Sequence, residues 1–156
     1  MSWEFFTLNE KNGSKFISQA YNWYQETPGF LRSYSEFDDD KRNFAKDLTN
    51  GSLFVGLLDG VFSGMVYGEV KTPDIIEGHL FCPTKADVDF ITSLVIYAKT
   101  ESLKTYKFVV THILKRHRVL HEIMRRSGFI DTGMRSWMGV YRNQLMEVHY
   151  YSTPSL

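Results

Sequence analysis

The sequence contains a single cysteine, Cys82, and no run approaching the roughly 20 apolar residues that a membrane-spanning helix needs. One cysteine excludes an intramolecular disulfide and any cysteine-based metal cluster, and it is typical of a reducing compartment. The segment Met1–Leu8 carries the acidic Glu4 and no basic stretch before an apolar run, so we expect neither export nor membrane anchoring. The expected location is therefore cytoplasmic.

The chain also lacks a net charge, because 18 lysines and arginines balance 18 aspartates and glutamates. A neutral chain has no overall field that would draw it to nucleic acid or to an anionic membrane, so neither is an expected partner. One predicted helix is locally basic, with Lys115, Arg116 and Arg118 at its start and Arg125 and Arg126 near its end. This face could contact phosphates, but it has no interleaved aromatic residues, which favours a solvated helix face.

The residues that are abundant predict one packed core. Of the 156 residues, 43% are hydrophobic and 15% aromatic, which is typical of a globular chain rather than a disordered one. No internal repeat, low-complexity tract or Pro/Gly/Ser-rich linker interrupts the sequence. We therefore predict a single domain that spans residues 1–156.

The clearest local signal is the pair Asp59-Gly60 between two β-rich runs, Leu53–Leu58 and Val61–Val70. This pair favours the positive φ angles of a tight hairpin, and the turn Lys71–Asp74 then returns the chain as a third antiparallel strand. The other predicted strands are Trp3–Leu8, Ile75–Cys82, Lys107–Ile113, Ser136–Tyr141 and Leu145–Tyr151. The predicted helices are Asn12–Tyr24, Asp38–Leu48, a segment capped by Asp87 or Asp89 that ends near Ser102, and Arg118–Ser127.

This order of elements resembles the GNAT (general N-acetyltransferase) superfamily from end to end. Two local sequences carry the resemblance. LFVGLLDGVFSGMVYGEV resembles the second and third strands of the family, and HRVLHEIMRRSGF resembles its penultimate helix with the following Gly-Phe, here Gly128-Phe129. The resemblance implies an α+β fold with a mixed, mainly antiparallel twisted sheet of about seven strands flanked by four helices.

Two positions depart from the family pattern. The loop that in the family carries glycines for the CoA pyrophosphate reads PTKADVDF here, with Asp87 and Asp89 where a diphosphate would lie and only Lys85 to compensate. The two aspartates predict capping of the next helix, and weak or altered anion binding at the helix N-terminus is the alternative. The tyrosine that the family often uses as an acid is replaced by Met124, which has no proton to donate.

Acylation of an amine requires a group that takes a proton from the ammonium nucleophile. Glu77, His79 and Phe81 alternate to one face of their strand, and the resemblance places this strand along the acceptor cleft. Glu77 or His79 is the candidate catalytic base, with a solvated strand face as the alternative, and Glu69 is a weaker candidate on the preceding strand. Should a phenol replace the missing acid, Tyr97, Tyr106 and Tyr141 are the available ones.

The resemblance implies acetyl-CoA as the donor. The backbone of Phe81 and Cys82 would pair with pantetheine, and His117 would contact pantetheine or phosphate unless it is a solvated part of the helix start. The cofactor-binding residues that follow are Phe81, Cys82, Lys85, Ala86, Asp87, Val88, Asp89 and His117.

No metal site is assigned from the sequence. His117 and His121 have the i, i+4 spacing of a ligand pair, and His112 and Glu122 lie near them, but spacing supplies no third ligand. Cys82, beside a proline and among apolar residues, is interpreted as a small buried hydrophobe rather than a nucleophile.

Two functions follow. The first is an acetyl-CoA-dependent N-acyltransferase that acts on an amine of a small molecule or protein. The second is a catalytically degenerate GNAT-like module that binds a protein partner or a second copy of itself through the closing hairpin SWMGVYRNQLMEVHYY. The missing glycines and tyrosine favour the second function.

These departures from the family pattern are similar to those of GNAT-like bacteriophage proteins, which agrees with a phage origin. Binding of CoA distinguishes the two functions, because only an enzyme requires it.

Overall fold

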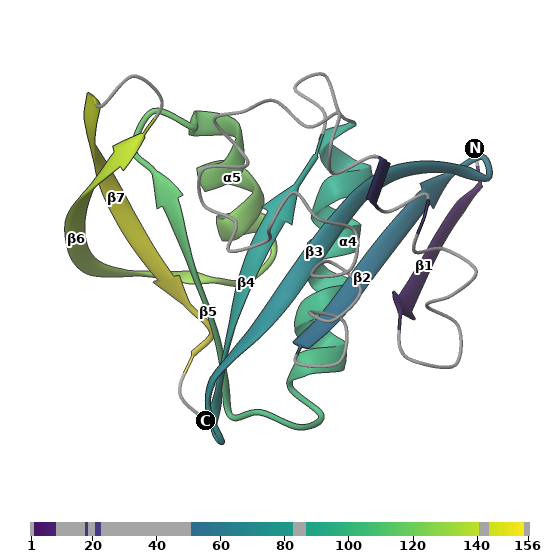
Figure 1. The fold of residues 1–156 in the computed structure, drawn as a ribbon, viewed down its shortest axis with the longest axis horizontal. Helices are drawn as coiled ribbons and strands as arrows, with labels where there is room; N and C mark the ends of the chain where they lie inside the picture. Colours follow the sequence, from purple (N-terminus) through teal and green to yellow (C-terminus); the bar gives the residue numbers. More distant parts are fainter. Residues whose placement is uncertain are drawn as a thin grey trace.

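The computed structural model describes residues 2–8, 18, 21–22, 51–82, 87–140 and 144–154 of the 156-residue chain. These residues form a seven-stranded sheet and two helices (Figure 1). The strands are β1 (Trp3–Leu8), β2 (Gly51–Leu58), β3 (Val61–Thr72), β4 (Ile75–Phe81), β5 (Phe108–Leu114), β6 (Ile130–Val140) and β7 (Gln144–Ser152). The helices are α4 (Val88–Ser102) and α5 (Arg118–Arg126).

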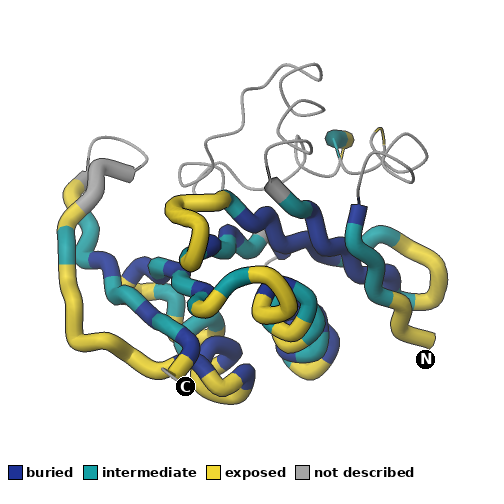
Figure 2. The backbone as a smooth tube through the Cα atoms, turned by 90° about the horizontal axis from the view of Figure 1, so that it is seen from below, coloured by how far each residue is buried: buried dark blue, intermediate teal, exposed yellow. Residues whose placement is uncertain are grey.

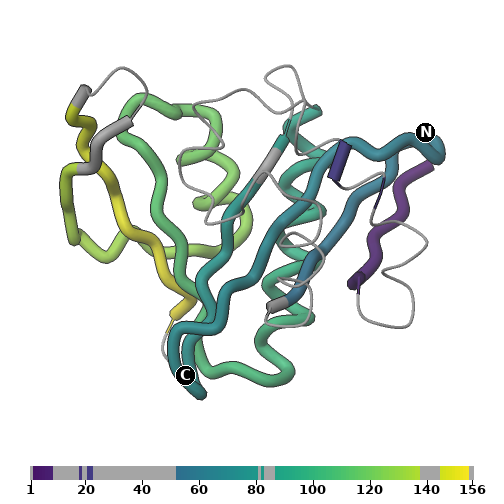
Figure 3. The backbone as a smooth tube through the Cα atoms, viewed as in Figure 1, coloured from purple at the N-terminus to yellow at the C-terminus, as the bar shows by residue number. Residues whose placement is uncertain are grey.

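The strand order in the sheet is β1-β2-β3-β4-β5-β7-β6. All neighbouring strands are antiparallel except β4 and β5, which are parallel and connected through α4. Figure 3 shows β7, in yellow, beside the green β5. The chain forms β6 at the edge of the sheet first and then returns as β7 between β5 and β6. The predicted α+β class and the mainly antiparallel seven-stranded sheet are confirmed.

Two of the four predicted helices, α4 and α5, are confirmed. Of the predicted helix Asn12–Tyr24, only Ser18, Tyr21 and Asn22 are described, and all three have helical backbone. The predicted helix Asp38–Leu48 lies outside the described residues. Within the part of the chain that the structure describes, no helix is long and apolar enough to span a membrane.

The predicted hairpin at Asp59-Gly60 forms between β2 and β3. Both residues adopt positive φ angles, 50° for Asp59 and 78° for Gly60, as the sequence pair predicts. The Asp59 amide donates to the Ser2 carbonyl, and the Ser2 amide donates to the Asp59 carboxylate, each at 2.8 Å. The turn therefore also anchors the chain before β1.

The sequence placed the start of β6 too late. The strand was expected from Ser136 but begins at Ile130, with a register shift against β7 between Asp131 and Arg135. Gly133 sits in this irregular stretch at a φ of 80°, and its amide donates to the Asp131 carboxylate. Because the irregularity breaks the alternation of side chains, the first half of the strand carried no strand pattern.

Helices α4 and α5 cover one face of the sheet. Figure 2 shows α4 beneath the strands with its buried side toward the sheet and its exposed side turned away. The core on this side includes Phe90, Ile91 and Leu94 of α4, all 1% exposed or less. On β4 and β5 the alternation places Ile76 and Val109 on this helix face, so their sequence neighbours Glu77 and Val110 point to the opposite face.

Candidate functional site

Strands β4 and β5 separate at the centre of the sheet. The described pairs of this parallel ladder end at Glu77 opposite Val110, although β4 continues to Phe81 and β5 to Leu114. Figure 1 shows the two strands diverging toward their C-terminal ends. At the point of separation the Thr111 hydroxyl donates to the Gly78 carbonyl at 2.7 Å. Backbone groups beyond this point are therefore not paired between the two strands in the way a continuous ladder would pair them.

Three titratable side chains meet at this opening, on the face opposite the helices. Glu77 Oε1 lies 2.8 Å from His112 Nδ1 and 3.6 Å from His79 Nε2. The two imidazole rings meet edge to face, with centroids 5.6 Å apart. The side chains are largely buried, with 7% of His79, 13% of His112 and 17% of Glu77 exposed. The structure thus brings together both predicted candidate bases, Glu77 and His79, with His112.

A second carboxylate and a lysine surround this group. Glu69 offers one oxygen, Oε2, to His79 Nε2 at 3.2 Å and the other, Oε1, to the Lys71 ammonium at 2.8 Å. Glu77 is arranged similarly, since its Oε2 lies 3.8 Å from Lys71 while its Oε1 faces the histidines. Each carboxylate therefore connects a histidine to Lys71. Glu69, a weaker candidate from the sequence, is a direct neighbour of His79.

These contacts determine the charge state of the group. Burial opposes ionisation of Glu77, but its hydrogen bond with His112 and the attraction of His79, His112 and Lys71 outweigh burial and lower the pKa of the carboxyl. Burial lowers the pKa of His79, and the neighbouring carboxylates oppose this shift only in part. The lowered pKa of each group therefore favours an ionised Glu77 beside a neutral His79, the forms that can accept a proton.

Sequence reasoning missed the role of His112. It grouped His112 with His117 and His121 by spacing along the chain, whereas the structure places it beside Glu77, a residue on a different strand. What the sequence does not reveal is the register between the parallel strands β4 and β5. Because Glu77 lies opposite Val110, the two-residue repeat of a strand brings His79 and His112 to the same level and face.

The N-terminus of α4 is the place where the resemblance would put the diphosphate of CoA. Asp87 caps the helix, and its carboxylate accepts the Phe90 amide at 2.9 Å, which confirms the predicted capping. Asp89 pairs with Arg126 of α5 at 2.6 Å. Lys85 and Ala86 lie outside the described residues, and Val88 is half-buried. The described helix end thus holds a carboxylate on one of its amides, and a diphosphate does not fit there without displacement of Asp87.

The end of β4 leads toward this helix. Phe81 pairs with Met65 of β3, so its backbone lies at the last described position of the strand. Cys82 follows at 8% exposure, and burial raises the pKa of its thiol to about 12. A thiol with this pKa carries almost no thiolate at neutral pH, which agrees with its interpretation as a buried hydrophobe.

The remaining predicted cofactor-binding residue, His117, lies just before α5, and Met124, where the family's acid is missing, lies near the end of that helix. His117 precedes the first turn, and burial together with Arg116 and His121 lowers the pKa of its imidazole to about 4. Met124 is 2% exposed and belongs to the core. On the helix side of the opening, Met124 and Thr111 help to line a mostly apolar cavity of about 30 Å³, which is more than one water molecule needs.

A second histidine group lies between α5 and β7. His121 Nε2 is 2.9 Å from the Leu114 carbonyl oxygen, and Nδ1 is 2.7 Å from the Tyr151 hydroxyl. Since a carbonyl only accepts, Nε2 carries the proton and the tyrosine donates to Nδ1. Tyr151 was not among the predicted phenols. Of those, Tyr97 bonds to Thr7 of β1, and Tyr141 lies outside the described residues.

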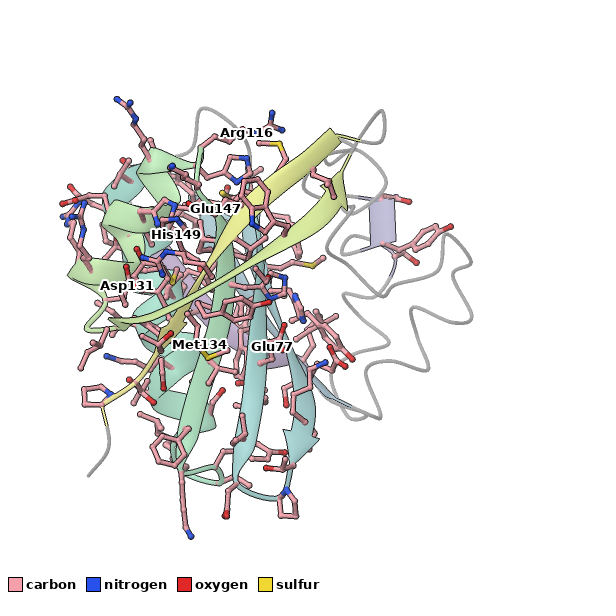
Figure 4. All side chains as sticks on the ribbon, turned by 90° about the vertical axis from the view of Figure 1, so that its left-hand side faces the viewer. Glu77, Arg116, Asp131, Met134, Glu147 and His149 are labelled. Atoms are coloured by element: carbon pink, nitrogen blue, oxygen red, sulfur yellow. The ribbon has the colours of Figure 1, made fainter. Side chains whose placement is uncertain are left out.

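His149 belongs to this second group. Its Nε2 lies 2.9 Å from Glu147, and its ring packs edge to face on His121 with centroids 5.1 Å apart. Figure 4 shows Glu147 and His149 close together on β7 and Glu77 apart from them. Four of the five histidines therefore form two groups, His79 and His112 at the β4–β5 opening and His121 and His149 under α5.

The order of the seven strands, the single parallel pair that separates, and the helix that crosses between its strands define the fold of the GNAT-type N-acetyltransferases. The solved structures that share this fold include an N-acetyltransferase from Staphylococcus aureus Mu50, with a TM-score of 0.71 and 13% identity over 98% of this chain and 97% of that one. A GNAT-family acetyltransferase from Streptococcus pneumoniae has a TM-score of 0.70 and 11% identity over 97% of this chain and 99% of its own.

The ribosomal-protein-S18-alanine N-acetyltransferase from Escherichia coli gives a TM-score of 0.72 and 11% identity, over 99% of this chain and 94% of its own. No protein-family model and no curated protein sequence matches the chain. At these identities the likeness shows the fold, and it confirms the predicted GNAT architecture.

Proposed function

We propose that residues 1–156 form a single cytoplasmic domain that transfers an acyl group from a thioester donor to an amine. The observation that carries this proposal is the position of the group Glu77–His79–His112, at the point where β4 and β5 separate in a fold shared with N-acetyltransferases. Three proton-accepting or hydrogen-bonding side chains converge there on rigid strands, which is the arrangement that amine activation requires.

In this proposal the ionised Glu77 or the neutral His79 removes one proton from the acceptor ammonium. The freed amine nitrogen then forms a bond to the acyl carbon and the carbon–sulfur bond breaks. The second proton that the nitrogen loses as the amide forms leaves on the sulfur as the thiol. His112 holds Glu77 by a 2.8 Å contact to Oε1, so it positions the carboxylate rather than accepting the proton itself. All three side chains are largely buried, which strengthens these contacts because water screens them less.

Acetyl-CoA is the proposed donor, and when bound it would supply the acyl group as a thioester. The edge of β4 that faces β5, where the parallel ladder ends before Phe81 and Cys82, suits the amides of its pantetheine arm. Its diphosphate would have to displace the Asp87 carboxylate from the Phe90 amide or lie elsewhere. The donor arm thus agrees with the described residues better than the diphosphate does.

The experiment is an acylation assay by mass spectrometry with acetyl-CoA and a panel of primary amines. The panel includes spermidine and a peptide with an N-terminal alanine, because the solved structures of this fold include a spermidine N-acetyltransferase chimera and the alanine N-acetyltransferase named above. We expect Glu77→Gln and His79→Gln to lower kcat by about 10²-fold or more, as loss of a general base does.

His149→Gln is the matched control, because this histidine also contacts a glutamate on a strand but belongs to the group under α5. Its kcat should equal that of the unchanged protein. The base assignment is wrong if Glu77→Gln and His79→Gln acylate the same amine as fast as the control does.

A second candidate function is a non-catalytic binding module, and two observations favour it. The hairpin β6–β7 exposes large apolar side chains, with Met134 63%, Trp137 65% and Leu145 71% exposed. The capped N-terminus of α4 presents the Asp87 carboxylate where an acyltransferase would hold a diphosphate. In this function the hairpin contacts a protein partner or a second copy of the chain, and no acyl donor is needed.

A further inference from the structure

The group at the β4–β5 opening has the composition and spacing of a metal site. Glu77, His79 and His112 each offer one ligand atom, and these three atoms lie within 4.8 Å of one another. Two imidazole nitrogens and one carboxylate oxygen are the donors of one class of three-ligand zinc site. We propose that Glu77, His79 and His112 bind a divalent transition-metal cation such as Zn²⁺.

The distances suit a small tetrahedral ion. Ligand bonds of 2.0–2.1 Å at tetrahedral angles place neighbouring donor atoms about 3.3 Å apart. Glu77 Oε1 lies 2.8 Å from His112 Nδ1 and 3.6 Å from His79 Nε2, values on either side of that spacing. The third pair, His79 Nε2 and His112 Nδ1, lies within 4.8 Å, so rotations of the side chains are needed to bring all three donor atoms to this spacing.

The strands hold the three ligands in fixed positions. Glu77 and His79 are two residues apart on β4, which gives them the same face, and His112 comes from the parallel neighbour β5. All three are largely buried, so their rotamers are restricted by packing. Ligands on strands are held more accurately than ligands on loops, which reduces the entropy lost when a metal binds.

The type of donor selects the class of ion. Imidazole nitrogens suit Zn²⁺ and the other late first-row metals, whereas Mg²⁺ and Ca²⁺ prefer sites made of oxygen alone. Three protein ligands leave one position of a tetrahedral ion for water or another small ligand. The site is therefore of the open type rather than the four-ligand structural type.

The surroundings of the three ligands favour a cation. Glu69 and Glu77 carry two negative charges against the single positive charge of Lys71, which is 37% exposed and therefore partly screened by water. Lys71 contacts the outer oxygen of each glutamate, so it directs Glu77 Oε1 toward the histidines. Such contacts to the outer atoms of a ligand orient it and commonly decide metal affinity.

A bound cation would occupy the lone pairs that the acyltransferase proposal assigns to Glu77 and His79. The two uses of the site therefore exclude each other at any one moment. The metal proposal itself rests on the three ligands alone, and it holds whether or not the chain transfers acyl groups.

The experiment is calorimetric titration of the full, chelator-treated chain with ZnCl₂, without acyl donor or amine, together with Co²⁺ titration by visible absorption. We expect one ion per chain and the d–d bands of a tetrahedral Co²⁺ site. Loss of a residue that only contacts a ligand costs up to about 100-fold in affinity. Loss of a ligand costs more, so His112→Ala should weaken binding by at least about 100-fold. His149→Ala, the control, should leave the Kd unchanged.

Because an alanine at a buried histidine can disturb folding, a second measurement uses the unchanged chain. Long-range ¹H–¹⁵N spectra should show that Zn²⁺ shifts the imidazole nitrogens of His79 and His112. The proposal is overturned if millimolar Zn²⁺ gives no heat, or if the nitrogens of His117, His121 or His149 shift instead. Failure here leaves the acyltransferase proposal intact, since that assay needs no metal.

Discussion

His117 illustrates how one half-buried side chain makes stability depend on pH. Burial, Arg116 and His121 lower the pKa of its imidazole to about 4, from the ordinary value of 6.5. Between these two pH values the unfolded chain binds a proton at this residue that the folded chain does not. The free energy of unfolding therefore contains a contribution that is fully present above about pH 6.5 and is lost as the pH falls toward 4.

We expect urea denaturation of the unchanged chain to show lower stability at pH 5 than at pH 7, and a smaller difference for His117→Gln. Carboxylates also titrate in this range, so the comparison between the two chains isolates the histidine. The side chain is only partly buried, which reduces the size of the effect. An identical pH dependence in both chains would contradict the lowered pKa.

Gly56 shows how a helix is seated on the sheet. A Cβ atom at this position of β2 would lie 2.7 Å from Cζ of Phe90, a ring on α4 that is 1% exposed. The ring is rigid and enclosed, so the added methyl group would push α4 away from the strands. Gly56→Ala is therefore expected to lower the free energy of unfolding by about 1–3 kcal/mol, as overpacking in a core does.

The matched control for this substitution is Gly78→Ala on β4. A Cβ atom there meets Val66 Cγ1 at 3.7 Å, an ordinary van der Waals contact. Chemical denaturation should show a stability equal to that of the unchanged chain or slightly higher, because alanine restricts the unfolded state. Equal losses in both variants would mean that the close approach at Gly56 does not limit the packing of α4.

At the scale of the whole molecule, the binding of acetyl-CoA separates an enzyme from a binding module. We expect Asp87→Ser to bind acetyl-CoA more tightly than the unchanged chain by about three- to tenfold, because one negative charge near the diphosphate is removed. Serine retains a hydroxyl that can accept the Phe90 amide, so the helix stays capped.

Glu101→Gln is the control for this calorimetric titration, since Glu101 is an acid on the same helix at its opposite end. Its Kd for acetyl-CoA should match that of the unchanged chain. Absence of binding in all three chains would contradict the acyltransferase proposal and favour the module that binds through β6 and β7.

Much of the fold could be predicted because its signals are local. The Asp59-Gly60 pair, the cap at Asp87 and the alternation of Glu77 and His79 each depend on residues a few positions apart. Turn geometry, helix capping and the two-residue repeat of a strand operate over the same short range. For this reason the hairpin, the start of α4 and the shared face of two site residues followed from the sequence alone.

The sequence by itself thus determined the class of fold, most of the described strands, helices α4 and α5, and two members of the candidate site. Only the tertiary structure decided that His112 joins Glu77 and His79, that Glu69 reaches His79, and that the β4–β5 ladder ends at Glu77. The physical reason is that β4 and β5 are joined through a helix, so their register depends on how α4 packs on the sheet. That packing is the sum of many side-chain contacts between distant segments, and no short pattern in the chain records it.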